Sequence, residues 1–257
     1  MLERFLMSYG RVAKTFFSYY GRFTIMSVQG FLAIRHIGLY WSEVVEEFIV
    51  IGRRSLPIVS TTAIFMGLVL GVQIGTQMSS MTAKYVEGGL VLRAILLEMG
   101  PVITAVVIAG RAGAGIASEL GTMVVTEQVD ALRTMAINPI DILVMPRLVA
   151  GIFAVPTLTV YSVVFSVFAG FVSTKFAINL DYPGFLKGMR MAFHGHDVFI
   201  CLFKAFIFGI IVMLLSSFWG LNSSRGAKGV GNATTSAVVS SLISIFVLDY
   251  IISALLL

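Results

Sequence analysis

The sequence predicts an all-α integral membrane protein with about five transmembrane helices, N-terminal interfacial helices and one amphipathic helix between the second and third spans. Of the 257 residues, 58% are hydrophobic and 12% are charged, and the charged fraction is about half that of a soluble domain. The mean hydropathy is +0.95. Apolar stretches of roughly 20 residues, the length that crosses a bilayer, recur along the chain.

Residues 1–56 form the predicted N-terminal region, which precedes a transmembrane domain over residues 57–257. On a helix, the basic residues of segment 2–23 fall near one face and the aromatic residues on the other, which is typical of a helix lying in the membrane interface. A solvated tail is the alternative. The segment lacks the unbroken apolar core and small-residue cleavage site of a signal peptide. Gly30–Ile51 is too polar to span and is predicted to be a second surface helix.

The predicted spans cover residues 57–78, 90–109, 149–172, 198–219 and 238–257. Positive charge sets their orientation. With the N-terminus in the cytoplasm, the inside segments carry twelve of the eighteen basic residues and the outside segments carry six. The C-terminus is then expected on the periplasmic side. The net charge of +5 lies beside apolar runs, which favours contact with a membrane surface over nucleic acid.

The segment 118–137 is predicted to be an amphipathic helix on the cytoplasmic side. Its polar face is mostly acidic, with Glu119, Glu127 and Asp130 against Arg133. Asn138-Pro139 ends it, because proline disfavours helical geometry in the preceding residue. The alternative is a connector resting on lipid headgroups, but such helices usually present basic residues. An acidic face is better suited to the basic groove of a protein partner.

The stretch Glu98–Arg147 resembles the signature of the MlaE (YrbE) permeases, membrane subunits of ABC-type lipid transporters associated with MCE proteins. The elements E-x-GPV, AGRAG, E-x-G-x-M, TEQ-x-x-AL and NP…PR stand in that family's order. The resemblance covers most of the chain from Pro57 and includes the last loop and helix.

The resemblance implies a multi-pass protein of the bacterial inner membrane in which segment 118–137 is the coupling helix. It implies a homodimer, a cytoplasmic ABC ATPase dimer, a hexameric periplasmic MCE-domain protein and a small cytoplasmic STAS-type subunit. The chain has no G-x-x-x-x-G-K-[ST] motif, so it is not expected to hold nucleotide phosphates in the P-loop manner. We therefore expect a non-catalytic subunit without a cofactor, with ATP and Mg²⁺ bound by the partner. "GRAGAG" at 110–115 is predicted to be a flexible, close-packed joint.

Charged groups inside the membrane mark candidate functional residues. Glu98 lies in the middle of the second span, and Gly100-Pro101 is expected to bend the helix beside it. Glu98 therefore either lines a substrate cavity or bonds to a neighbouring helix. In the first span, glycines at 67, 71 and 75 form a stripe suited to close helix contact. The resemblance places a lipid pocket at the dimer interface, and the predicted substrate-binding residues are Leu70, Gln73, Ile74, Gln77, Met81, Arg93, Leu97 and Glu98. Where the family often has an arginine before the glutamate, this chain has Leu97, and Arg93 is the predicted substitute.

Asp249 in the last span is predicted to be a structural clamp bonded to serines 216, 241, 244 and 253, with a substrate or proton role as the alternative. The group His194-Gly-His196-Asp197 has no clear further ligands, so we predict a solvated outer loop and no metal site. Cys201, the only cysteine, is expected to be a small buried residue.

The predicted function is a permease that moves phospholipid or a related lipid between the inner membrane and a periplasmic MCE-protein carrier, for outer-membrane lipid homeostasis. A proton- or ion-coupled secondary transporter using Glu98 and Asp249 is the alternative. Such transporters often contain two related halves, which five spans and one central helix do not offer. An intramembrane hydrolase would need a nucleophile with a positioned base, and the histidines lie far from the intramembrane acids.

Overall fold

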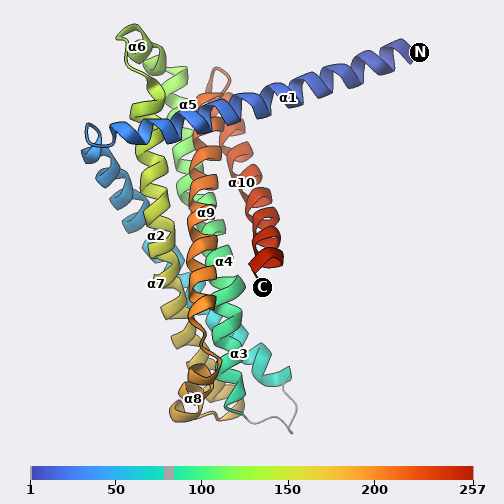
Figure 1. Cartoon of the computed structure of the whole chain (residues 1–257), viewed down its shortest axis with the longest axis vertical. Helices are drawn as coiled ribbons and strands as arrows, with labels where there is room; N and C mark the ends of the chain where they lie inside the picture. Colours follow the sequence, from blue (N-terminus) through green and yellow to red (C-terminus); the bar gives the residue numbers. More distant parts are fainter. Residues whose placement is uncertain (1, 78–83, 257) are drawn as a thin grey trace.

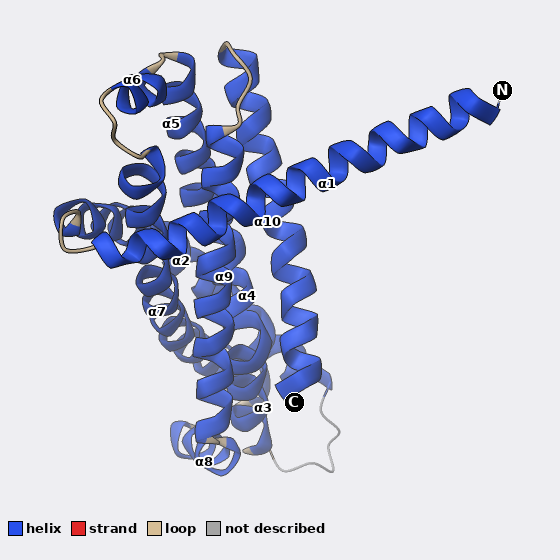
Figure 2. Cartoon of the chain, turned by 45° about the horizontal axis from the view of Figure 1, so that its top comes forward, coloured by secondary structure: helices blue, strands red, loops and turns tan. Residues whose placement is uncertain are grey.

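A computed structural model describes residues 2–77 and 84–256, with side chains from residue 18 onward. Every element in the described part is a helix, which confirms the predicted fold class (Figures 1 and 2). The α-helices are α1 (Leu2–Ala33), α2 (Trp41–Gln77), α3 (Val86–Ala94), α4 (Gly100–Ile108), α5 (Ala114–Val125), α6 (Gln128–Thr134), α7 (Met145–Ile178), α8 (Tyr182–Ala192), α9 (Gly195–Leu221) and α10 (Ala227–Leu256). A 3₁₀ turn, η1 (Ile34–His36), and three π-helical turns, η2 (Ile95–Met99), η3 (Ala109–Gly113) and η4 (Ile140–Val144), complete the set.

Five helical segments are long and apolar enough to cross a membrane: Trp41–Gln77, Val86–Val125, Ile140–Ile178, Gly195–Leu221 and Ala227–Leu256. Within the described residues, each contains the corresponding predicted span. The chain runs back and forth between two ends of the bundle, called here the α6 end and the α8 end. Figure 1 shows α1 lying across the α6 end, so the N-terminal segment and the segment after the second span share one side, as predicted.

The N-terminal helices differ from the prediction. Gly30–Ala33 belongs to α1, and α2 begins at Trp41 and continues through Pro57 as one helix. The acidic residues near its start do not break the helix, because a helix can extend past the bilayer into water. Pro57 lies inside α2, and proline is tolerated in membrane helices because neighbouring groups satisfy the backbone carbonyl that it frees. Residues 2–17 are helical, but their side chains lie outside the described part, so the predicted amphipathic face stays a prediction.

The second span is continuous from Val86 to Val125 and contains two π-helical turns, η2 and η3. π-Helical turns occur mostly as single turns within α-helices, frequently at functional sites. Here η2 contains Glu98, and η3 contains the AGRAG sequence. The predicted bend at Gly100-Pro101 thus coincides with the end of a π turn.

The glycine stripe of α2 packs against α7, as predicted. A Cβ added at Gly67 would collide with the backbone oxygen of Ser166, and one at Gly71 would lie 2.8 Å from the oxygen of Gly170. Two serines of α7 bond back to α2: Ser166 Oγ donates to the Ala63 carbonyl at 2.9 Å, and Ser173 Oγ donates to the Leu68 carbonyl at 2.7 Å. Small residues and hydroxyl groups therefore join these helices closely.

The predicted helix over 118–137 is wrong as a single element. Its first part is the end of the second span, and its last part is the short helix α6. Glu127 separates them, with a left-handed φ of 60°. The periodicity missed this break because the residues from 118 to 137, apart from Met123 and Gln128, fit one helical wheel, whereas the left-handed backbone of Glu127 redirects the chain.

A further helix, α8, stands at the opposite end, where the sequence predicted a loop. It packs closely on α3, since a Cβ at Gly188 would collide with the backbone oxygen of Tyr85. Phe185 of α8 is buried in a cluster with Val91, Ile95 and Leu180.

Candidate functional site

The tip of the α6 end is formed by α6, whose polar residues point away from the bundle. Asp130 and Arg133 form an exposed ion pair at 3.0 Å, and Glu127 is exposed where the chain turns. Val129 is buried and anchors the short helix. The tip therefore presents charged groups on a short protruding helix, a form suited to docking in the groove of another protein.

Glu119, the fourth predicted coupling residue, does not belong to this tip. Its Oε1 accepts a hydrogen bond of 2.8 Å from Nη2 of Arg147. The same Nη2 lies 3.1 Å from Oε1 of Glu47, and Nη1 donates to the Leu143 carbonyl at 2.6 Å. We call Glu47, Arg147 and Glu119 the arginine triad. It joins α2, α7 and α5 with one cation between two carboxylates.

A second cluster lies deeper in the bundle. Nζ of Lys204 on α9 is 3.1 Å from Glu98 Oε1 in η2 and 2.7 Å from Asp249 Oδ1 on α10. We call these residues the lysine triad. Like the first triad, it joins three segments of the bundle with one cation and two carboxylates. All three residues lie within predicted spans.

The lysine triad is closely hydrogen-bonded. Nζ of Lys204 donates to the Leu97 carbonyl and to Ser253 Oγ, each at 2.7 Å, and to Glu98 Oε1 at 3.1 Å. These bonds use its three N–H groups, so Asp249 interacts with it as an ion pair. Ser253 Oγ donates in turn to Glu98 Oε1 at 3.1 Å. The side chain of Lys204 is fully buried, whereas that of Glu98 is 40% exposed, so Glu98 is the member that a ligand can reach.

Two predictions about these charges need correction. Of the serines expected around Asp249, Ser253 contributes through Lys204, but Ser216 and Ser241 are buried without a hydrogen-bond partner. Arg93 does not replace an arginine beside Glu98, because its Nε pairs with Asp197 at 3.1 Å. The helix face accounts for this: Arg93 lies on the second span toward the start of α9, and Lys204 occupies the position next to Glu98.

The predicted binding residues of α2 do not converge on one site within the chain. Leu70 and Ile74 are partly buried and pack against the cluster that contains Phe185. Gln73 and Gln77 are exposed on another side of the helix. Met81 lies outside the described residues. A pocket made from the two glutamines and Glu98 would therefore need a second surface to close it.

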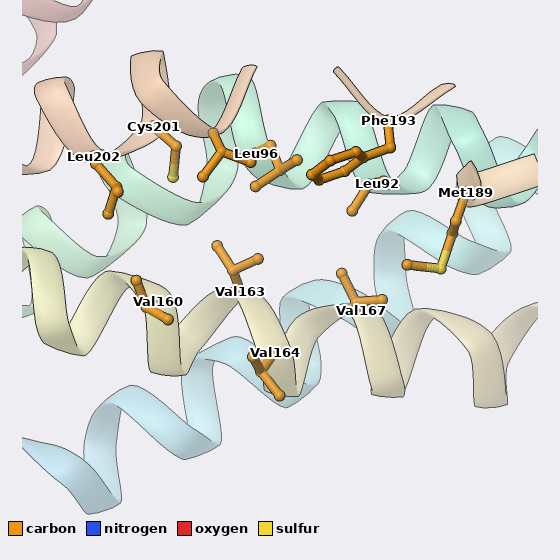
Figure 3. Close-up of a pocket in the computed structure, with 11 residues that line it drawn as sticks. Leu92, Leu96, Val160, Val163, Val164, Val167, Met189, Phe193, Cys201 and Leu202 are labelled. Atoms are coloured by element: carbon orange, nitrogen blue, oxygen red, sulfur yellow. The ribbon is translucent and has the colours of Figure 1, made fainter. Parts of the chain in front are cut away.

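An apolar groove of about 350 Å³ lies between the second span, α7, α8 and α9 (Figure 3). Figure 3 shows Leu92 and Leu96 facing Val163 and Val167 across it. Every lining residue is apolar: Leu92, Leu96, Val160, Val163, Val164, Val167, Met189, Phe193, Val198, Cys201 and Leu202. Such a surface suits hydrocarbon and offers nothing to a polar group. Cys201 is buried there, as expected for a small apolar residue.

The predicted solvated loop over 194–197 is wrong, because Gly195–Asp197 forms the first turn of α9, with His194 as its N-cap. Asp197 is buried in its pair with Arg93, and His194 Nδ1 lies 2.9 Å from the Ala192 carbonyl oxygen. Within the described residues, no group of three or more His, Cys, Asp or Glu residues is placed to hold a metal ion.

Lys204 is the functional residue that the sequence reasoning missed. The charge count places it among the six basic residues of the outside segments and span ends, yet its side chain is among the largest fully buried ones in the described chain. The signal was present: two intramembrane acids need a cation nearby, and Lys204 is the only charged residue within span 198–219.

The family model described as "Permease MlaE" matches residues 44–255. The chain is similar to a "Probable ABC transporter permease protein" of Rickettsia bellii, with 38% identity over 91% of each chain. A "Probable ABC transporter permease protein slr1045" of Synechocystis is 41% identical over 82% of this chain and 80% of the relative. "Protein TRIGALACTOSYLDIACYLGLYCEROL 1, chloroplastic" of Arabidopsis thaliana is 33% identical over 90% of this chain and 66% of the relative.

Proposed function

The chain belongs to the MlaE permease family, and we propose that this ABC transporter permease moves phospholipid between the bacterial inner membrane and a periplasmic MCE-protein carrier, for outer-membrane lipid homeostasis. The single observation that carries the proposal is the family match over residues 44–255. The structure adds a protruding charged tip at one end of the second span and a partly accessible carboxylate in its middle.

Lipid as the cargo is supported by chemistry and by one relative. The chloroplast relative is named after trigalactosyldiacylglycerol, a diacylglycerol lipid. The apolar groove between α7 and α9 has a volume in the range of small-molecule sites and a lining suited to an acyl chain. The lysine triad carries one more carboxylate than cation, so the ammonium of a phospholipid headgroup would balance the charge at Glu98.

The partners follow from what this chain lacks and what it exposes. The chain has no P-loop motif, so ATP and Mg²⁺ would be bound by a separate cytoplasmic ATPase dimer. The α6 tip is the surface that we assign to that partner, with Glu127, Asp130 and Arg133 as contacts. A second copy of the chain would close the pocket that α2 and Glu98 leave open. A hexameric MCE-domain protein would dock at the α8 end, and a small STAS-type subunit would join on the ATPase side.

This arrangement requires the α6 end to face the cytoplasm and the C-terminus to face the periplasm. Seven basic residues before Pro57 support that orientation through the positive-inside rule.

The lysine triad bears on the alternative function. A secondary transporter that uses Glu98 and Asp249 needs both acids free to exchange an ion or proton. Both are paired with one fully buried lysine, and such a pair is costly to open in a membrane. The geometry therefore supports a structural role for Asp249 and favours the ABC permease.

Copurification tests the proposal directly. The tagged permease is expressed with its whole native operon, and an Asp130→Lys variant reverses the charge at the tip. The wild-type chain should copurify with an ATPase and support ATP-dependent transfer of labelled phospholipid to a periplasmic acceptor, whereas the variant should lose both. A Lys228→Asp variant, also outside the predicted spans, is the matched control for charge reversal. Transfer without any ATPase would contradict the proposal.

A further inference from the structure

A pair of arginines at the α6 side of the membrane lacks the carboxylates that accompany the buried cations described above. Arg54 lies three residues before the predicted first span, and Arg111 lies two residues after the predicted second span. Arg54 directly precedes Ser55, whose Oγ accepts a hydrogen bond of 2.9 Å from Nη1 of Arg111, so both basic residues lie where the second span meets this part of α2. Among the described residues, no ion pair includes either of them.

Arg111 is held in place by α2. Its Nη1 donates to Ser55 Oγ at 2.9 Å and is 3.5 Å from the carbonyl oxygens of Val50 and Ile51. These neutral acceptors orient the guanidinium without neutralising it. They use one of its terminal nitrogens, and a guanidinium offers further N–H donors in a fixed planar fork.

Two acids on the same helices are already bound to another cation. Glu47, two turns before Arg54 on α2, is bound to Arg147, and so is Glu119 on the second span. Two arginines near each other repel unless an anion lies between them. The contrast with Arg147, which has two carboxylates, indicates that the missing anion comes from outside the described chain.

The surface around Arg111 is open. A Cβ added at Gly110 or Gly115 would meet no other group within 4 Å, so the described chain leaves the helix backbone uncovered on that side. Glycine permits close approach of a ligand to the backbone. The π-helical turn η3, which carries Arg111, is of the kind frequently found at functional sites.

We propose that Arg54 and Arg111 bind the phosphate of a glycerophospholipid headgroup in the leaflet at the α6 end. Basic pockets between transmembrane helices bind anionic headgroups in this way, and arginine forks match phosphate oxygens bidentately. The site is at the end of the bundle opposite α8 and separate from the lysine triad. It requires a chain inserted in a membrane and does not depend on lipid transport.

Native mass spectrometry of the full chain with dioleoyl phosphatidylglycerol tests the site. Arg54→Gln should weaken retention of one lipid about tenfold, the loss expected for one charge-assisted contact. Arg53→Gln is the matched control, because Arg53 is adjacent in sequence but about 160° around the helix from Ser55. It should change retention less than twofold. Dioleoylglycerol, which has the same chains and no phosphate, can enter the apolar groove but not this site, so Arg54→Gln should leave its retention unchanged.

Arg111→Gln should act like Arg54→Gln, but it also removes bonds that hold α2, so Arg54→Gln is decisive. Equal losses in the Arg53 and Arg54 variants would show only general surface charge and would overturn the site. A loss of dioleoylglycerol in the Arg54 variant as large as that of the phospholipid would also overturn it, because the contact would then not involve the phosphate. If Arg54→Gln instead released a copurifying protein and left lipid retention unchanged, the anion would be a protein carboxylate and the lipid site would be refuted.

Discussion

The arginine triad and the lysine triad contain the same set of charges at different depths in the bundle. Each places one cation between two carboxylates from two other segments. Exposure is similar in the two, since both cations are buried and each triad has one partly exposed acid, Glu119 at 52% and Glu98 at 40%. Depth differs: Glu47, Glu119 and Arg147 all lie outside the predicted spans, whereas the three groups of the lysine triad lie within them. The same charge pattern can thus be a replaceable contact at one depth and an obligatory one at another.

The second span takes part in both triads. Glu119 ties one end of it to α2 and α7, and Glu98 ties its middle to α9 and α10. A movement at the α6 tip that rotates this helix must therefore strain one triad or the other. We expect the arginine triad to open, because it lies outside the predicted spans where water can replace its contacts. The lysine triad would then stay intact during the movement.

The largest effect is expected at the lysine triad. Lys204→Met leaves two carboxylates unpaired inside the bundle, and we expect a loss of about 3–5 kcal/mol in the free energy of unfolding. Thermal unfolding of the detergent-solubilised chain measures it. The triple variant Glu98→Gln/Lys204→Met/Asp249→Asn removes every charge and should recover most of the loss. A single variant as stable as the wild type would show that the triad is not formed.

A smaller effect is expected at the arginine triad. Arg147→Met leaves Glu47 and Glu119 unpaired, but these acids lie outside the predicted spans and can be hydrated, so we expect a loss of about 1–3 kcal/mol. Lys204→Met is measured under identical conditions for comparison. If Arg147→Met were the more destabilising of the two, depth in the membrane would not be what separates the triads.

Ser253 tests how far the lysine triad depends on hydrogen bonds in addition to charge. Ser253→Ala removes a neutral partner of Lys204 and Glu98, and we expect a loss of about 0.5–1.5 kcal/mol. Ser244→Ala on the same helix is the control, since no side-chain hydrogen bond of Ser244 to the triad is present in the described structure. A loss as large as that of Lys204→Met would mean that the hydroxyl group, and not the charge balance, holds the site.

The smallest effect on stability is expected at the tip. Asp130 and Arg133 are both about two-thirds exposed, so Asp130→Asn should change the free energy of unfolding by less than about 0.5 kcal/mol. Binding of the ATPase should nevertheless weaken, which pull-down with the purified partner measures. A clear loss of stability without any loss of ATPase binding would show that the Asp130–Arg133 pair serves folding and not docking.

The fold class and the five spans could be predicted because they depend on sums over many residues, such as hydropathy and the length of apolar runs. The break at Glu127 could not, since one left-handed residue leaves no trace in a helical wheel. The partner of Asp249 was missed for a different reason. The position of Lys204 near one end of its span indicates a residue close to the membrane surface. Its actual role depends on the packing of α9 against η2 and α10, which the sequence of α9 alone does not show. The prediction that the glycine stripe of α2 packs closely on another helix was confirmed. Close packing needs small residues on one face, whichever helix is the neighbour.

The second span is one continuous helical segment, Val86–Val125, and our proposal is that it binds lipid at Glu98 and leads to the ATPase contact at α6. Native mass spectrometry of the copurified complex, with subunits and bound lipid counted together, tests this most directly. Glu98→Gln leaves Lys204 balanced by Asp249, so the complex should keep its ATPase and lose one bound lipid per permease, the lipid at Glu98. Asp130→Lys should lose the ATPase and keep lipid on the permease. Loss of both from either variant, or of neither from both, would contradict the claim.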